Sequence, residues 1–436
     1  MIEFIGITTC LLIFLIFSFF PLQVGISNKF LSNYKFFKYD LLLINLLINF
    51  ILLLFLSFTK INLVYYFIFL VSLSIIFNVF LLFKNEINFK NFKDINFLFF
   101  IVLNLIIFMF IAQEPTLSWD SQKNWFYKAQ SFFYNYNFFD LDKIHGVDYY
   151  PHLGTYFWGF FWKNSLLGYE YFGRYIFVFT FLLSIFSICD HLNVKKYLKA
   201  LIITLIVLLC FDNFLFKGYQ EVLVFSLMLF ASKNIYNYIL YKNNLYLIIS
   251  FVCLNLLPWI KNEGYLLLGI FAMSLLITIK NFPKKVEIIL FVCFSILSVI
   301  IKKLLFLNYL DINLTHGGNF YFTITLFDFV NNLISIFIGF IVAIFKYKIW
   351  IFIFLSMFLI SKNKKINKTD NQFINLLKIN LIMYFLLILG IYFSVSDHIY
   401  GIDWWIDNSL DRIMYQISGF FIIYIMISIN YLKIKI

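Results

Sequence analysis

Long apolar runs separated by short polar segments recur along the whole 436-residue chain. A helix needs about 20 mostly apolar residues to cross the roughly 30 Å hydrocarbon core of a membrane. The pattern therefore predicts an all-α polytopic membrane protein with about 12–14 transmembrane helices. The predicted spans cover residues 4–22, 41–59, 62–83, 95–113, 172–189, 200–216, 222–240, 245–260, 264–279, 287–305, 329–345, 349–360, 378–394 and 413–431.

The amino-acid composition agrees with this pattern. Hydrophobic residues make up 63% of the chain and charged residues 13%, which excludes a chain of soluble domains. The first span carries Glu3 where a signal peptide has basic residues, and it lacks a small-residue cleavage site, so we expect a true span. The cysteines all lie inside or at the ends of apolar runs, which excludes an external disulfide framework.

Lysines between the spans predict the sidedness of the chain. They gather in the loops after the first and third spans, and the positive-inside rule places such loops in the cytoplasm. The N-terminus and residues 114–170 then lie outside, and the C-terminus lies inside. The stretch "SKNKKINK" at 361–368 also requires the cytoplasm, whereas strict alternation places it outside. We therefore predict that 349–360 is half of a broken or re-entrant element.

The formal charge of +12 comes from lysines concentrated in the short loops, so we expect membrane lipids and no nucleic acid as partners. The chain then has three predicted parts. These are N-terminal transmembrane helices over 1–113, an external loop of short interfacial helices over 114–170, and a transmembrane bundle with short external loops over 171–436.

The external loop begins with "SWDSQKNWFYKAQ" at 118–130, directly after the fourth span. At helical spacing this stretch has one apolar and one polar face, so we expect a helix lying on the membrane surface. The apolar face comprises Trp125, Phe126, Ala129, Phe132 and Phe133, and the polar face comprises Asp120, Lys123, Asn124 and Lys128. Asp120 would thereby be held at the interface.

Other ionisable residues lie at predicted external ends of spans. Arg174 and Arg412 are the two arginines among 34 basic residues, and the planar fork of arginine suits bidentate binding of a phosphate. Glu221, Lys261 and Glu263 lie at similar positions, and Lys261 is the near partner for Glu263 along the chain. Ionisable groups near a membrane mostly have a functional or a paired role, and the sequence leaves both open for these three.

These fragments resemble the GT-C class of integral-membrane glycosyltransferases, which take a sugar from a polyprenyl-phosphate carrier at the outer membrane face. In that class the first large external loop carries an essential acidic residue just after a span, and Asp120 matches it, followed by the pair Lys128-Ala129. "HGVDYYPHL" at 145–153 matches a histidine-proline-aspartate-tyrosine-proline element only loosely. "GYQEVLVF" at 218–225, "KNEGYLLL" at 261–268 and "NSLDRIMYQ" at 408–416 resemble the same bacterial subgroup.

The resemblance implies transfer of a sugar from a polyprenyl-phosphate donor to a glycan, lipid or protein acceptor at the outer face of a bacterial inner membrane. It implies that Asp120 is the catalytic base or positioning carboxylate. The implied phosphate ligands are Arg412, Lys128 and Arg174, and the residues expected to line the cavity are Asp148, His152, Glu221, Lys261 and Glu263.

Other interpretations stay open at this point. A polymerase or ligase of lipid-linked oligosaccharides has similar hydropathy but relies on more external arginines, and a flippase or transporter predicts midplane charges and paired broken helices. Asp120 also suits the N-cap of a helix. The histidines lack the helical spacing of metal ligands, and a divalent ion bridging Asp120 and the donor phosphate stays an alternative.

Overall fold

The computed structural model describes residues 2–21, 36–83, 94–143, 150–192, 194–282, 284–310, 326–363, 366–394 and 401–431. Most of these residues lie in helices and none of them lies in a strand, which confirms the all-α polytopic membrane fold. The chain forms two compact units. Unit 1 comprises Met1–Ser226, Trp259–Asn262 and Asn308–Ile312, and unit 2 comprises Leu227–Pro258, Glu263–Leu307 and Asn313–Ile436.

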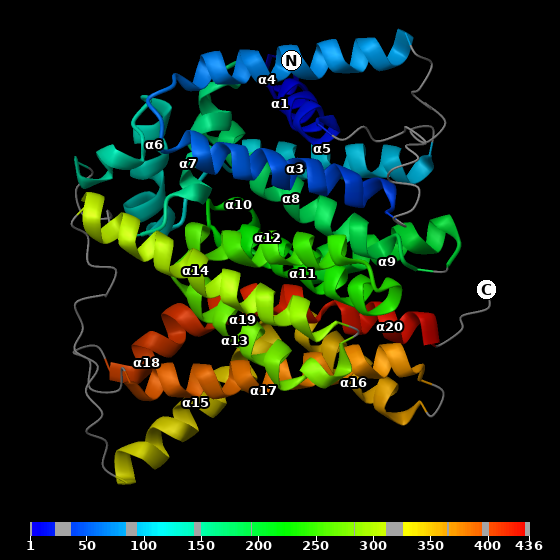
Figure 1. Cartoon of the computed structure of the whole chain (residues 1–436). Coiled ribbons are helices and arrows are strands. Elements are labelled where there is room, and N and C mark those ends of the chain that lie inside the picture. Colours follow the sequence, from blue (N-terminus) through cyan, green and yellow to red (C-terminus); the bar gives the residue numbers. More distant parts are fainter. Residues whose placement is uncertain are drawn as a thin grey trace. The chain divides into compact units, whose positions relative to one another are not determined.

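Unit 1 contains the first six predicted spans and the loop segment (Figure 1). Short helices fill the segment between α5 and α8, as predicted. The helices are α1 (Ile2–Phe19), α3 (Lys38–Leu56), α4 (Leu63–Phe83), α5 (Ile95–Gln113), η2 (Ser121–Phe126), α6 (Tyr127–Phe133), η3 (Phe138–Lys143), α7 (Leu153–Lys163), α8 (Glu170–Cys189), α9 (Lys196–Leu209) and α10 (Asn213–Phe216), and α11 (Glu221–Tyr241) begins here.

Unit 2 contains the remaining predicted spans. The last two residues of α12 belong to the short segment Trp259–Asn262 of unit 1. Its helices are α12 (Asn244–Ile260), α13 (Glu263–Ile277), η4 (Ile279–Asn281), α14 (Lys285–Leu310), α15 (Leu326–Lys346), α16 (Ile349–Lys362), α17 (Lys368–Ser394), α18 (Gly401–Trp405), η5 (Ile406–Leu410), α19 (Asp411–Phe421) and α20 (Ile423–Tyr431).

Nine helices among the described residues are long and apolar enough to cross a membrane. Helices α15 and α16 meet at a bend of 94°, so the prediction of a broken or re-entrant element at 349–360 is confirmed. The predicted spans at 245–260 and 264–279 form the shorter apolar helices α12 and α13. The predicted span at 200–216 is interrupted after Leu209, close to the polar Asp212, and continues as α10.

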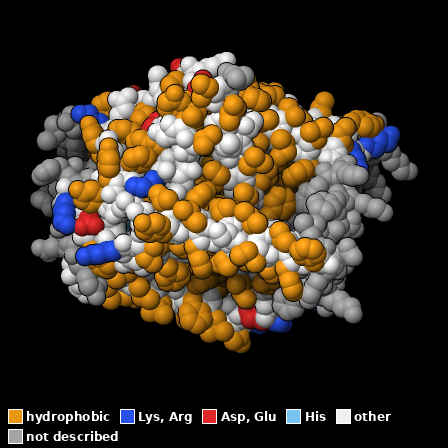
Figure 2. Space-filling view, turned by 90° about the horizontal axis from the view of Figure 1, so that it is seen from above, with side chains coloured by type: hydrophobic (Ala, Val, Ile, Leu, Met, Phe, Trp, Pro, Cys, Tyr) orange, Lys and Arg blue, Asp and Glu red, His pale blue; other side chains and the backbone are white. Residues whose placement is uncertain are grey.

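Unit 1 is built around α8, in which residues 172–189 are all buried inside the protein. Helices α1, α3, α5, α7 and α9 all contact it. By contrast, α4 exposes most of its apolar side chains, among them Tyr65 and Ile76. Apolar side chains also predominate on the face shown in Figure 2, as expected of a surface that contacts lipid.

Polar side chains within unit 1 satisfy backbone groups that a membrane helix leaves exposed at its end. At the C-terminal end of α1, the Asn45 amide donates a 2.8 Å hydrogen bond to the Ser18 carbonyl. The Asn49 amide donates to the carbonyls of Phe17 and Phe20 at 2.7 and 2.9 Å. Lipid offers no donors for such carbonyls, so these asparagines fix α3 against the end of α1.

The helix ends of unit 1 follow the predicted alternation. Asp94, at the start of α5, forms ion pairs with Lys38 at 3.6 Å and with Lys196 at 3.2 Å. All three residues belong to segments predicted to be cytoplasmic. At the other ends of these helices, Phe138 of the predicted external loop donates its N–H to the Ser57 carbonyl at 2.7 Å. Loops assigned to one side therefore lie together.

In unit 2 the lysine-rich segment at 361–368 is followed by α17, whose Asp370 accepts hydrogen bonds from Tyr236 at 2.9 Å and Tyr431 at 2.5 Å. Tyr238, two residues after Tyr236, donates to Glu287 at the start of α14 at 3.0 Å. These segments share one end of the unit, and all were predicted to be cytoplasmic. The lysines were thus a better guide than the count of spans.

Candidate functional site

The helix that carries Asp120 is capped by a different residue. The Ser118 hydroxyl accepts a hydrogen bond from the N–H of Ser121 at 3.3 Å and donates to the Ser121 hydroxyl at 2.7 Å. Asp120 itself has helical backbone angles and makes no capping hydrogen bond. The backbone N–H of Ser118 also donates to the Lys217 carbonyl at 3.2 Å, which ties the start of the helix to the chain just after α10. Capping is therefore the work of Ser118.

The segment after Asp120 is π-helical over Ser121–Phe126, and α6 continues it. Trp125, Ala129 and Phe132 are buried, as predicted, and Lys123 is exposed. The prediction that Lys128 shares the exposed face is wrong, because this side chain is completely buried. A π-helix turns less per residue than an α-helix, so the residues after it lie on a different face from the one that 3.6-residue spacing predicts.

Lys128 has a definite position in unit 1. Its ammonium donates a 2.5 Å hydrogen bond to the Tyr150 carbonyl. The Tyr150 ring in turn contacts the Trp125 ring, with 5.1 Å between the centroids. The lysine thus joins α6 to the chain just before α7. Phosphate binding by Lys128 stays a prediction. It requires the ammonium either to give up its hydrogen bond to this carbonyl or to bind the carbonyl and the phosphate together.

Arg174 lies on α8 with 2% of its surface exposed. Its Nε lies 2.9 Å from Glu170 Oε1, and its terminal nitrogens donate to the carbonyls of Phe216 at 2.6 Å and Pro115 at 2.8 Å. A weaker bond of 3.4 Å reaches the Thr116 carbonyl. The guanidinium therefore holds the chain leading to Asp120 against α8 and α10, and phosphate binding by Arg174 stays a prediction.

Glu221 and Lys261 form a buried ion pair. The Lys261 ammonium lies 2.6 Å from Glu221 Oε1, and the side chains are 5% and 0% exposed. Among the described residues the second oxygen of Glu221 has no hydrogen-bond partner. Gln220, next to it, is also buried, and its amide lies directly against Gly154 at the start of α7. The sequence suggested Glu263 as the near partner of Lys261, and the ion pair that the structure shows joins Lys261 to Glu221.

His152 lies inside an aromatic cluster. Its Nε2 is 2.9 Å from the Ser57 hydroxyl, and its ring contacts the rings of Phe58, Phe138 and Trp259 at centroid distances of 5.9, 5.1 and 5.9 Å. The histidine is completely buried. Its contacts hold the start of α7 against the end of α3.

Asp148, named with His152 in the sequence analysis, lies outside the described residues. A nearby carboxylate of the loop, Asp140, is described and has a structural role. Its Oδ2 accepts the Asn137 N–H at 3.1 Å and its Oδ1 pairs with the Lys143 ammonium at 2.6 Å. Burial raises the pKa of the Asp140 carboxyl, but these two donors outweigh it and hold the pKa below its usual range.

Unit 2 contains the other two candidates, Arg412 and Glu263. Both lie close enough to Tyr392 for their charges to act on its hydroxyl, which is 2.9 Å from the Ser409 hydroxyl. Ser409 belongs to η5, a second π-helical segment, directly before α19. Asp411, beside Arg412, forms an ion pair with Lys346 at the end of α15. Phosphate binding by Arg412 stays a prediction.

Lys302 is an ionisable residue that the sequence reasoning passed over. It lies in α14, is completely buried, and donates to the carbonyl of Pro258. Its ammonium lies 4.4 Å from the centre of the Tyr265 ring. The signal was present in the sequence, because a lysine inside an apolar span marks a functional or paired group. Here it satisfies a carbonyl near the end of α12.

The described residues contain no group of three or more histidine, cysteine, aspartate or glutamate side chains placed to hold a metal ion. Unit 1 contains Asp120, Lys128, His152, Arg174, Glu221 and Lys261, and Arg174 contacts the chain just before the Asp120 helix. In unit 2, Arg412 and Glu263 both lie near Tyr392. Comparison with known proteins adds no relative, since no family model, no curated protein and no solved structure matches this chain.

Proposed function

We propose that this protein transfers a sugar from a polyprenyl-phosphate donor to an acceptor hydroxyl at the outer face of a bacterial inner membrane. The observation that carries the proposal is the separation of roles between Ser118 and Asp120. Ser118 caps the loop helix, and Asp120 makes no capping bond. Its position on a helix that another residue caps, directly after the fourth predicted span, supports the base or positioning role that the resemblance implies.

The surroundings of Asp120 support this role. Bonds from Arg174 to the carbonyls of Pro115 and Thr116 and from Ser118 to the Lys217 carbonyl fix the chain just before it. Behind it, Trp125 is buried. Asp120 is thus carried on an anchored helix, and a catalytic group held in this way loses little freedom when its substrate binds.

The proposed reaction is a displacement at the anomeric carbon of the donor sugar. The acceptor hydroxyl oxygen bonds to that carbon as the bond from the carbon to the phosphate oxygen breaks. The hydroxyl proton passes to Asp120, and the polyprenyl phosphate leaves with the bonding electron pair. The charge on the departing phosphate needs a cation, the role that the resemblance implies for Lys128, Arg174 and Arg412.

The test is a glycan and glycolipid mass profile of a deletion strain complemented at matched membrane abundance. Wild type restores the missing sugar, and Asp120→Asn does not, because loss of a general base typically lowers the rate by about 100-fold or more. The matched control is Glu114→Gln, which changes an exposed carboxylate of the same loop. Full restoration by Asp120→Asn would remove the carboxylate from the mechanism.

A transporter of lipid-linked sugars is a second candidate, favoured by the 94° bend between α15 and α16. Helices interrupted within the membrane form the substrate sites of many transporters. Proteoliposomes that contain a fluorescent polyprenyl-phosphate sugar distinguish the two candidates. Movement of the lipid from one leaflet to the other without formation of a new glycosidic bond would favour transport.

A further inference from the structure

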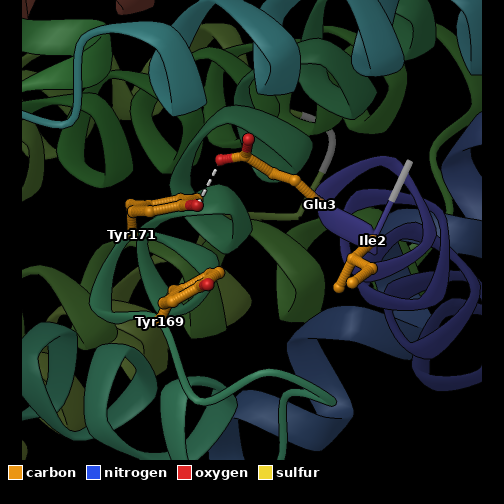
Figure 3. Close-up of a pocket in the computed structure, with 4 residues that line it drawn as sticks. All are labelled: Ile2, Glu3, Tyr169 and Tyr171. Carbon is orange, nitrogen blue, oxygen red and sulfur yellow. Dashed lines mark hydrogen bonds between the residues drawn. The ribbon is translucent and has the colours of Figure 1, made fainter.

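A cavity of about 500 Å³ opens beside the first turn of α1 and the segment between α7 and α8. Four side chains line it, namely Ile2, Glu3, Tyr169 and Tyr171 (Figure 3). The Tyr171 hydroxyl donates a 2.5 Å hydrogen bond to Glu3 Oε1. The cavity is accessible, since Ile2 is 66% and Tyr169 48% exposed. Its volume falls in the range of small-molecule sites, about 300–1,000 Å³.

The two tyrosines present hydroxyl groups to this cavity. Their rings stack on each other, with 5.5 Å between the centroids and 20° between the planes. Tyr171 also contacts the rings of Phe172 and Tyr175 at 4.8 and 6.0 Å. Figure 3 shows both tyrosine hydroxyls on the side of the rings where Glu3 and Ile2 lie.

This arrangement defines the chemistry of a ligand. An aromatic cage for a quaternary ammonium group needs several ring faces turned toward one point, and here the two rings stack on each other. A phosphate is disfavoured by the Glu3 carboxylate. The remaining combination is one charged acceptor and two phenolic groups that both donate and accept, beside an apolar side chain. It matches a neutral ligand rich in hydroxyl groups.

The backbone around the tyrosines is held firmly. The Trp162 indole N–H donates to the Gly168 carbonyl at 2.7 Å, and Gly168 adopts a left-handed conformation with φ of 64°. Such a conformation suits glycine, and it turns the chain into Tyr169 and α8. Glu170, between the two tyrosines, pairs with Arg174. Because Arg174 binds the carbonyls just before the Asp120 helix, one network connects the cavity to that helix.

We propose that this cavity binds a neutral saccharide through Glu3 and the hydroxyls of Tyr169 and Tyr171. Its identification as the sugar portion of the acceptor rests on the proposed function. Sugar hydroxyls donate to the carboxylate and exchange hydrogen bonds with the phenols, and Ile2 covers an apolar ring face. Because Glu3 is negatively charged, it repels the phosphate of the donor, which we expect to bind elsewhere.

The experiment uses the full chain in lipid nanodiscs free of sugar-headed detergent. Binding is measured to a printed panel of neutral, acidic and amino-sugar oligosaccharides. Wild type retains neutral oligosaccharides, and Tyr169→Ala and Glu3→Gln bind them about tenfold more weakly, as expected from the loss of one hydrogen bond to a charged or phenolic group. The matched control, Tyr134→Ala, changes a tyrosine that is 64% exposed in the predicted external loop and binds as wild type does.

Three results would overturn the inference: no retention of neutral oligosaccharides by wild type, preference for acidic or cationic ones, or unchanged binding by the variants of Tyr169 and Glu3. Asp120→Asn separates this inference from the proposed function. It should bind oligosaccharides normally while failing to restore the missing sugar. If it restores the sugar but the cavity variants lose binding, Asp120 has no part in the proposed reaction and the saccharide site stands.

Discussion

The buried ion pair between Glu221 and Lys261 gives the sharpest test of how this structure is held together. The two charged atoms are 2.6 Å apart, and the side chains are 5% exposed or less. Lys261→Met removes the cation and leaves a carboxylate in a site from which water is excluded. The second oxygen of Glu221 has no partner among the described residues, so it offers no compensation.

Removal of one member of a buried pair typically costs about 3–5 kcal/mol, whereas replacement of both members by apolar or neutral groups is often close to neutral. We therefore expect Lys261→Met to lower the stability of unit 1 by about 3 kcal/mol or more. The double variant Glu221→Gln with Lys261→Met should recover most of this loss. The exposed pair of Lys143 and Asp140 is the control, with Lys143 62% exposed, and Lys143→Met should cost less than about 1 kcal/mol.

The assay is thermal unfolding of the purified protein in one detergent, followed by intrinsic fluorescence. It compares wild type, Glu221→Gln, Lys261→Met, the double variant and the control Lys143→Met. The cycle isolates the interaction between the two side chains from their separate effects. An interaction energy near zero, or a loss for Lys261→Met no greater than that for Lys143→Met, would refute the view that this pair is desolvated.

Three further outcomes follow from the structure. Gly173→Ala places a methyl 2.3 Å from a backbone oxygen of α7 and should lower stability by about 1–3 kcal/mol. Gly269→Ala meets no atom within 4 Å and should raise stability by up to about 1 kcal/mol. Equal shifts in thermal stability would contradict this. Ser118→Ala should cost about 1 kcal/mol in the same assay, since it removes a helix cap; an unchanged midpoint would place the cap elsewhere. The pKa of Asp140 lies below its usual range, so its contribution to stability is present above the unfolded pKa of about 3.9 and is lost as pH falls below it. Wild type should therefore lose more stability than Asp140→Asn between pH 5 and pH 3, and parallel losses would contradict this assignment.

Much of the candidate site could be predicted from the sequence, because ionisable residues are rare in so apolar a chain. Glu221 and Lys261 stood out partly for this reason, and the structure pairs them. The same rule, applied to the interior of predicted spans, would have found Lys302, whose ammonium satisfies a carbonyl near the end of α12. The partner of a buried charge was not predictable, because the partner lies 40 residues away along the chain.

The position of Lys128 shows where periodicity fails. A pattern of 3.6 residues assigns it to the surface, but six π-helical residues precede it and change the face on which it lies. No residue type in "SWDSQKNWFYKAQ" announces a π-helix. It forms here in a helix that is anchored at Ser118 and packed through Trp125 and Ala129, and such packing is decided by the surrounding helices.

The sequence by itself determined that this is a helical membrane protein and where most of its helices run. Those properties depend on local composition, because the transfer of a segment into lipid is governed by its own side chains. The tertiary structure decided the rest. It made Ser118 the cap, buried Lys128 and Arg174 against carbonyls, and placed Glu3 beside Tyr171, 168 residues away. Such contacts join distant segments whose meeting depends on how whole helices pack, and no local pattern of residues encodes them.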